Sequence, residues 1–295
     1  MVEFDVLSYG TIGLDRVLRL PHLPRPDMGV HTDGEETRLG GNASNTASHL
    51  AAWGLRVAVS GTTIGDDAVG DEILARLKAT PGLDTCYVRR QGKLPSMYCI
   101  ILVTPDGERA IIGVNANNNP PTPPTPEMIS RARLLTLDLY GGEERALAAR
   151  MACEAGLPVV AGEMRTPNHP ALPYTTIAIA SAAEIACPPE AFARAAQAAG
   201  TRYVIVSDGP RPAQAFDANG QTHRCSPPTI PVDDTTGAGD AFRAGVVYGV
   251  LTNALLKEIL ALGVAAGSLK AAGRNAATTP SELGAVIELA KILQE

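Results

Sequence analysis

The segment DTTGAGD at residues 234–240 has the residue types and spacing for chemistry on an anionic group. Its two glycines and one alanine leave the backbone uncovered, and the run of small and apolar residues at 241–251 predicts a helix directly after it. A glycine-rich turn that opens a helix directs several free N–H groups at one point, where the helix dipole attracts phosphate. The segment therefore predicts a phosphate-binding turn, with donors on Gly237, Ala238 and Gly239.

Asp240 ends this segment and falls in the first turn of the predicted helix. A carboxylate beside a phosphate site repels the phosphate, so binding alone does not explain it. A base that removes a proton from an attacking hydroxyl group does explain it. The alternative is an acid that only satisfies the helix dipole. The preceding glycines favour the catalytic interpretation.

A second candidate site lies near the N-terminus, in the segment GGNASN at residues 40–45. Asn42 and Asn45 are three residues apart at the start of a predicted helix, so they share a face. Gly40 and Gly41 would let a ligand approach the backbone. Because amide side chains both donate and accept, this pattern suits the vicinal hydroxyls of a sugar. Helix capping is the alternative for the two asparagines.

Short β-like runs alternate with helical patterns along most of the chain. Strand patterns occupy residues 5–8, 57–61, 134–137, 158–161, 176–180 and 203–207, and helical spacing occupies 43–52, 67–77, 143–155 and 189–199. Such alternation predicts an α/β fold with a mostly parallel central sheet and helices on both faces.

Two stretches, residues 14–39 and 97–114, interrupt this alternation. The second contains two apolar runs on either side of residues 105–108, which predict a hairpin turn. Together the stretches predict a small β-sheet lid, apart from a main domain formed by residues 1–13, 40–96 and 115–295. The alternative is that these strands only extend the main sheet.

The segment at 234–240 resembles the C-terminal signature of the PfkB, or ribokinase-like, family of sugar and nucleoside kinases. Residues 40–54 are similar to the N-terminal signature of that family, and the two occur in the expected order. The resemblance implies a ribokinase-like three-layer αβα domain with a lid that closes over the sugar and excludes water. It implies ATP-dependent phosphorylation of a hydroxyl group of a small sugar. Asp240 is then the general base, and the amides of Gly237, Ala238 and Gly239 form the anion hole.

The resemblance also assigns the sugar site. Asp15 occupies the position of a sugar-binding acid in the family, and it joins Gly41, Asn42 and Asn45 as an expected substrate contact. The alternative for Asp15 is a turn residue. Lid residues such as Tyr98 are expected to select the substrate, together with Ile112.

For the nucleotide, the family has an Asn-x-x-Glu element after a strand, and the matching place here runs from Ser181 to Glu184. Glu184 is retained and is expected to hold Mg²⁺ through water, whereas Ser181 replaces the asparagine. The alternative for Glu184 is a helix N-terminal acid. Ser207 and Gly209 resemble a phosphate-binding turn of the family, and Asn275 is a candidate at the edge of the adenine pocket.

Many relatives also bind a potassium ion beside the anion hole, mostly through carbonyl groups. A few ligands of that site come from the Asp234–Thr236 segment, and Asp234 and Thr236 match the family there. The implied cofactors are therefore ATP, Mg²⁺ and K⁺. The lid of the family often pairs with a second subunit, so a homodimer through the lid is expected.

The 40–45 segment and residues 162–167 resemble the ketohexokinase-like and fructokinase-like branch, with ribose as the next substrate candidate. Two alternatives stay open. One is a nucleoside kinase of the same family. The other is a catalytically weak sugar-binding or regulatory protein, which Ser181 motivates and Asp240 opposes. A dinucleotide oxidoreductase is disfavoured, because no GxGxxG follows the first strand.

Composition narrows the partners. The 295-residue chain has a formal net charge of −6 and no long basic run, which argues against nucleic acid. We find no signal-peptide pattern and no apolar stretch long enough to span a bilayer, so no membrane partner is expected. The five cysteines have no metal-binding spacing and predict reduced thiols in the cytoplasm.

Overall fold

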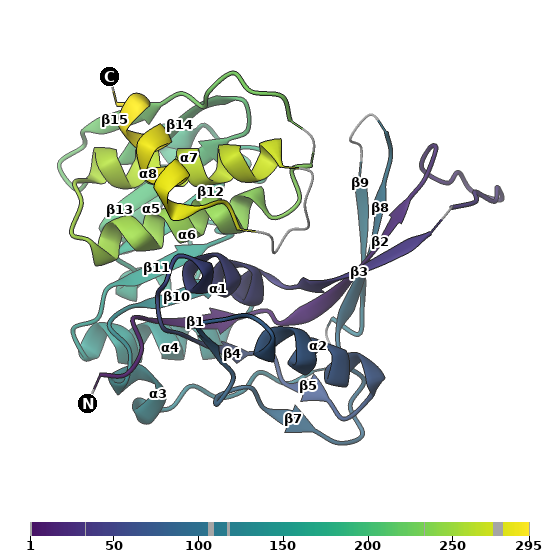
Figure 1. The fold of residues 1–295 in the computed structure, drawn as a ribbon. Helices are drawn as coiled ribbons and strands as arrows, with labels where there is room; N and C mark the ends of the chain where they lie inside the picture. Colours follow the sequence, from purple (N-terminus) through teal and green to yellow (C-terminus); the bar gives the residue numbers. More distant parts are fainter. Residues whose placement is uncertain are drawn as a thin grey trace.

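The computed structural model describes residues 2–32, 34–105, 109–116, 119–232, 234–273 and 280–294. Its largest element is a nine-stranded sheet (Figure 1). In spatial order the strands are β15 (Thr222–Cys225), β14 (Arg211–Phe216), β13 (Tyr203–Asp208), β12 (Ile177–Ser181), β11 (Val159–Gly162), β10 (Leu135–Asp138), β1 (Val6–Gly10), β4 (Val57–Gly61) and β6 (Leu83–Asp84). The strands from β13 to β6 are parallel, and only β14 and β15 join in antiparallel fashion. The prediction of a mostly parallel sheet is confirmed.

Helices cover both faces of this sheet. One face carries α1 (Asn42–Ala52), α2 (Ala68–Lys78), α6 (Ala238–Leu251), α7 (Leu256–Ala272) and α8 (Leu283–Ile292), and the other carries α3 (Pro126–Ser130), α4 (Glu143–Glu154) and α5 (Pro189–Ala198). Successive strand residues point to opposite faces. Val57 and Val59 therefore join the core under α1, while Ala58 joins the core on the side of α4. This is the predicted three-layer αβα arrangement.

A second sheet stands apart from the first and projects beyond it (Figure 1). It contains, in spatial order, β3 (Glu35–Gly40), β2 (Gly13–Arg19), β8 (Tyr98–Val103) and β9 (Arg109–Val114). The alternative that these strands extend the main sheet is therefore wrong. β8 and β9 pair antiparallel as a hairpin requires, although residues 106–108 of the predicted turn lie outside the described residues. A short parallel pair, β5 (Ile64–Gly65) and β7 (Arg90–Gln91), lies beside α2.

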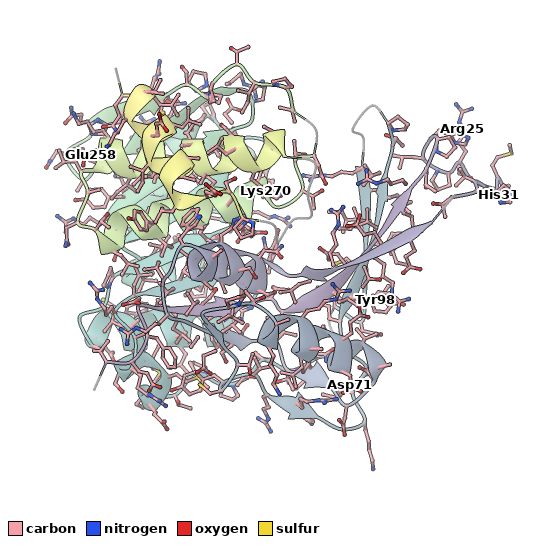
Figure 2. The ribbon with its side chains drawn as sticks, in the orientation of Figure 1. Arg25, His31, Asp71, Tyr98, Glu258 and Lys270 are labelled. Atoms are coloured by element: carbon pink, nitrogen blue, oxygen red, sulfur yellow. The ribbon has the colours of Figure 1, made fainter. Side chains whose placement is uncertain are left out.

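The connections bring the two sheets together at one edge. Parallel strands end at the same edge of a sheet, and ligands of α/β proteins bind outside these carboxyl ends. β1 leads from this edge directly into β2 of the lid, and β3 returns to it at the start of α1. Figure 2 shows Tyr98 near the base of the lid and Arg25 and His31 at its far tip. Among the described helices, none has the length and apolar character needed to cross a membrane.

Candidate active site

Asp240 lies where helix α6 begins. Gly237 precedes the helix in a left-handed conformation with φ of 76°, which glycine adopts without the clash of a side chain. Asp240 follows in the first turn and is only 5% exposed. The turn thus brings the carboxylate to the carboxyl edge of the sheet, facing helix α1.

Two amides of α1 hold this carboxylate. Asn42 Nδ2 donates to Asp240 Oδ1 at 3.1 Å, and Asn45 Nδ2 donates to Oδ2 at 2.9 Å. Within the described part of the chain, Asn45 Oδ1 is buried with no hydrogen-bond partner, so it can accept from a hydroxyl group. Gly41 lies next to them with φ of 88°, and a Cβ there would collide with the carbonyl of Thr11. The shared face predicted for the two asparagines is what the structure has.

The lid adds a second carboxylate. Asp15 on β2 is 7% exposed, and Gly40 on the neighbouring strand leaves the room that its carboxylate occupies. Burial and the nearby charge of Asp240 together raise the pKa of Asp15 to about 7, whereas Arg38 opposes the shift. The carboxyl groups of Asp15 and Asp240 are thus close enough to influence one another. A ligand with several hydroxyl groups can donate to both.

Asp240 itself has a raised pKa. Burial raises the pKa of this carboxyl to about 6, while the charge of Arg243 and the amides of Asn45 and Asn42 hold it down. The group is therefore mostly ionised at neutral pH, and its affinity for a proton exceeds that of an exposed aspartate. Both properties suit a general base.

The glycine-rich turn presents fewer free amides than the sequence predicts. The Ala238 N–H already donates to the carbonyl of Thr235 at 3.1 Å, so in this conformation it is not an open donor. For Gly237 and Gly239, the described hydrogen bonds include no backbone acceptor. A Cβ added to Gly239 would meet no atom within 4 Å. The open donors of the turn are thus Gly237 and Gly239, with free space in front of Gly239.

The predicted nucleotide residues follow the carboxyl ends of two adjacent strands. Ser181 ends β12 and pairs with Ser207 on β13, and Gly209 lies just after with φ of 56°. Glu184 is in a turn, because the next helix, α5, starts only at Pro189. The alternative of a helix N-terminal glutamate is therefore wrong. Asn275 lies outside the described residues.

The candidate metal residues differ in how well they are placed. Glu184 is 37% exposed at the side chain, and its carboxylate meets the Arg165 guanidinium at 3.1 Å. Asp234 instead accepts the Thr236 N–H at 2.8 Å and lies 3.4 Å from the guanidinium of Arg38. Within the described ranges, no three His, Cys, Asp or Glu residues gather as a ready metal site.

The structure corrects the predicted substrate-selecting face of the lid. Asp15 is in register with Cys99, and paired residues of adjacent strands share a face. Tyr98 pairs instead with Leu14, whose side chain belongs to the core on the opposite face. Ile112 pairs with Ile100 and likewise lies on the face away from Asp15. Cys99, not Tyr98 or Ile112, therefore faces the site.

Three polar residues of the site are not indicated by the sequence motifs. Asp138 ends β10, is fully buried, and accepts the Thr11 N–H at 2.5 Å. Glu163 follows β11, and its carboxylate pairs with Arg243 of α6 at 2.7 Å. A charged residue in an apolar helix, one turn after Asp240, was a signal in the sequence that could have identified Arg243.

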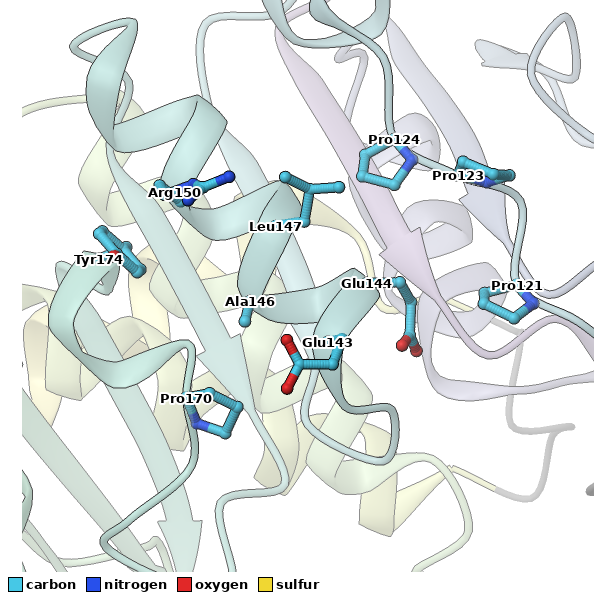
Figure 3. A pocket seen from close by; sticks show the side chains of 10 residues that line it. All are labelled: Pro121, Pro123, Pro124, Glu143, Glu144, Ala146, Leu147, Arg150, Pro170 and Tyr174. Carbon is cyan, nitrogen blue, oxygen red and sulfur yellow. The ribbon is translucent and has the colours of Figure 1, made fainter.

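A groove elsewhere on the molecule contains none of the predicted site residues. Figure 3 shows it between α4 and the proline-rich segment before α3, lined by Pro121, Pro124, Leu147 and Tyr174 among others. Its volume is about 500 Å³. The groove is separate from Asp240, whose partners come from other elements.

Known proteins share both the sequence pattern and the fold. The model of the pfkB family of carbohydrate kinases matches residues 4–282. An ATP-dependent ribose-1-phosphate kinase of Halopiger xanaduensis is 30% identical over 291 residues, covering 94% of this chain and 95% of that protein. A ribokinase of Arabidopsis thaliana is 25% identical, covering 96% and 80%. The structure of Arabidopsis ribokinase with ribose and ATP superimposes with a TM-score of 0.83 at 23% identity, covering 99% of both chains.

The chain therefore belongs to the pfkB family of carbohydrate kinases and has the ribokinase-like fold. The family resemblance and the αβα fold with its second small sheet are confirmed. The relatives with named activities above are sugar kinases, so neither a nucleoside substrate nor a non-catalytic role is favoured.

Proposed function

We propose that this carbohydrate kinase transfers the γ-phosphoryl group of ATP to a hydroxyl group of a small sugar, with Asp240 as the general base. One observation carries the proposal. The Asp240 carboxylate, at the start of α6, is buried between the amides of Asn42 and Asn45 of α1. It lies beside the open space at Gly239.

In the proposed reaction, Asp15, Gly41, Asn42 and Asn45 bind the sugar hydroxyls. Asp240 accepts the proton of one hydroxyl as its oxygen attacks the γ-phosphorus. The bond between that phosphorus and the bridging oxygen breaks, and ADP leaves with the bonding electrons. The proton then passes from the carboxyl to water.

The charge on the moving phosphoryl group is stabilised by the N-terminus of α6. The N–H groups of Gly237 and Gly239 supply the donors, and the Ala238 N–H can join them if its bond to Thr235 opens on binding. By analogy with oxyanion holes, each such donor lowers the barrier by about 3 kcal/mol.

The proposed nucleotide site contains Ser181, Ser207, Gly209 and Glu184. Glu184 fits a water-mediated Mg²⁺ site once its partner Arg165, which is half exposed and free to turn away, releases it, because Mg²⁺ keeps most of its waters and needs only this partly exposed carboxylate. When bound, Mg²⁺ neutralises phosphate charge. The hydroxyl of Ser181 is shorter than the amide of the family asparagine, so we expect a weaker grip on the triphosphate.

A potassium site at Asp234 and Thr236 does not fit this conformation. The Asp234 carboxylate is engaged by the Thr236 N–H and by Arg38, and a guanidinium 3.4 Å away opposes a second cation. We therefore route no step of the reaction through K⁺.

We propose a neutral sugar as the substrate. Four carboxyl groups, on Asp15, Asp138, Glu163 and Asp240, interact around the site, and the guanidinium of Arg243 is already bonded to protein acceptors. A phosphorylated sugar would add about −1.5 to −2 charges to this region. Ribose and the ketohexoses suggested by residues 162–167 are both neutral sugars.

The test is a coupled assay of ADP release with ribose, fructose, tagatose, deoxygluconate, nucleosides and ribose 1-phosphate. The proposal expects ADP release with a neutral sugar and a lower kcat/KM for ribose 1-phosphate. Sugar-dependent thermal stabilisation without ADP release from any of these compounds would contradict the kinase proposal. A preference for ribose 1-phosphate would contradict only the choice of substrate.

The rate is expected to depend on pH through Asp240. Because burial raises the pKa of this carboxyl to about 6, acidification protonates the base and removes its ability to accept a proton. At pH 5 about a tenth of the enzyme remains ionised, so kcat/KM is expected to be about tenfold lower than at pH 7.5. The pH profile of kcat/KM measures this. A rate independent of pH from 5 to 7.5 would exclude Asp240 as the titrating base.

We also propose a homodimer through the lid. Ile111 and Ile112 on β9, an edge strand, are 58% and 50% exposed. Exposed apolar residues on an unpaired edge favour association. Sedimentation velocity is expected to give a dimer that Ile112→Glu converts to monomer, and a monomeric wild-type protein would refute the dimer.

We also propose a cytoplasmic location, which the free state of the five cysteines supports.

A further inference from the structure

Arg243 is the largest of the fully buried side chains in the described part of the chain, and it is 1% exposed. It lies on α6, one turn after Asp240. A guanidinium loses much hydration energy on burial and is stable only where protein groups replace the water. The partners of Arg243 are therefore the groups that replace this water, and they indicate the role of the side chain.

Its neutral partners come from two other elements. Nε and Nη2 donate to Thr46 Oγ1 of α1 at 2.9 and 2.8 Å, and Nη2 donates to the Asn42 carbonyl at 2.6 Å. Nη1 donates to the Leu137 carbonyl near the end of β10 at 3.3 Å. Arg243 thus fixes the helix that carries the base against the helix that carries the sugar-binding amides.

Its charged partners are the base and a second acid. Nη2 meets Asp240 Oδ1 at 3.3 Å, and Nη1 meets Glu163 Oε2 at 2.7 Å. Glu163 has φ of 57°, a conformation that residues other than glycine rarely adopt. The preceding residue is Gly162, where a Cβ would come within 2.7 Å of Nη1. The backbone after β11 is therefore shaped to bring this carboxylate onto the guanidinium.

The charges around Asp240 come from four elements. Arg243 on α6 is the cation, and the anions are Asp15 on β2, Asp138 on β10 and Glu163 after β11. Burial raises the pKa of Asp240, and Arg243 acts against that rise. Loss of this cation would therefore favour the protonated and inactive form of the base.

The neighbouring charges also shift the pKa of Glu163. Burial raises the pKa of this carboxyl, Arg243 acts against the rise, and with the charges of Asp240, Asp138 and Glu184 the pKa reaches about 8. Glu163 is therefore mostly protonated in the pH range where Asp240 titrates. There it accepts a hydrogen bond from Arg243 and adds little charge near the base.

We propose that Arg243 is a positioning residue for the general base: its charge keeps Asp240 ionised, and its hydrogen bonds, with Glu163 as a second acceptor, hold the base against the amides of α1. This inference rests on the proposed function, which makes Asp240 the base. It predicts that loss of the guanidinium charge moves the titration of the base to higher pH, whereas loss of the Glu163 carboxyl does not.

The test is the acidic limb of the pH profile of kcat/KM for three variants. Arg243→Gln is expected to move the limb to higher pH by about one unit or more, since a cation beside the acid is lost. Arg243→Lys keeps the charge and is expected to restore most of the wild-type midpoint, with kcat still reduced because the forked hydrogen bonds are lost. Glu163→Gln is expected to leave the limb in place, because Glu163, with its pKa raised to about 8, is already mostly protonated over that range.

Arg90→Gln is the matched control. Arg90 on β7 also makes two ion pairs, with Asp66 and Asp71 at 2.8 Å each, and none of its partners in the described part of the chain belongs to the site. Its substitution is expected to leave the limb in place, and thermal melting reports any loss of stability in all variants.

The outcomes separate this inference from the proposed function. An acidic limb unchanged in Arg243→Gln, with only a lower melting temperature, would make Arg243 purely structural and overturn the inference. If that variant does not fold, Arg243→Lys decides alone: a wild-type midpoint with a reduced kcat supports the inference, and a kcat equal to that of the wild type overturns it. A wild-type enzyme without kinase activity would instead contradict the proposed function.

Discussion

The Asp240→Asn enzyme is expected to bind sugar and ATP like the wild type but to turn over about 10²–10⁴-fold more slowly. The amide keeps the shape of the carboxylate and can still accept from Asn42 or Asn45, so the binding site is retained. It cannot take the proton of the attacking hydroxyl. The measurement is kcat from ADP release, with the sugar dissociation constant from calorimetry.

Asp67→Asn is the matched control for this substitution. Asp67 caps α2 by accepting the Gly70 N–H at 2.7 Å, away from the proposed site. Its substitution is expected to lower stability by up to about 1 kcal/mol while leaving kcat unchanged. If Asp240→Asn retained wild-type turnover, another group would be the base.

The Gly239→Val enzyme is expected to lose about 10²–10³-fold in kcat/KM for ATP. The new side chain would fill the space that the proposal reserves for the transferred phosphoryl group, and it would cover the amide donors. Stability is expected to change little, because a Cβ at this position meets no atom within 4 Å. Steady-state kinetics with varied ATP, together with a melting curve, measures both effects.

Gly284→Val provides a control at an equivalent place. Gly284 is the second residue of α8, as Gly239 is of α6, and a Cβ there also meets no atom within 4 Å. Both variants replace a glycine by a β-branched residue in a first helical turn, so they share any change in helix propensity. Equal activities in the two variants would mean that the space before Gly239 is not the phosphoryl site.

The parts of the site that lie within one sequence segment were predictable. The spacing of Asn42 and Asn45 puts both amides on one helical face, and the 234–240 segment places Asp240 in a first turn. The alternation of strands and helices likewise predicted the parallel sheet and its two helical layers. These inferences depend on local periodicity, which the chain expresses without tertiary information.

The remaining parts depend on contacts between distant segments. Arg243 is one polar residue in an apolar helix, and only the folded chain brings Thr46 and Glu163 to its guanidinium. The same limit applies to the lid. Side chains alternate along a strand, so an error of one residue in the predicted register puts Tyr98 in the site in place of Cys99.

The two glycines of the 234–240 segment show a related limit. Gly237 has φ of 76°, so a side chain there would strain the turn, whereas Gly239 lies inside α6 with no such requirement. The sequence presents them as alike. The structure separates a glycine needed for the backbone from one that leaves space for a ligand.

A crystal structure with a bound sugar and a non-hydrolysable ATP analogue tests the central claim most directly. The account predicts a sugar hydroxyl within hydrogen-bond distance of Asp240, in line with a γ-phosphate that accepts from the N–H groups of Gly237 and Gly239. A γ-phosphate away from this turn, or an Asp240 carboxylate that no sugar hydroxyl reaches, would contradict it.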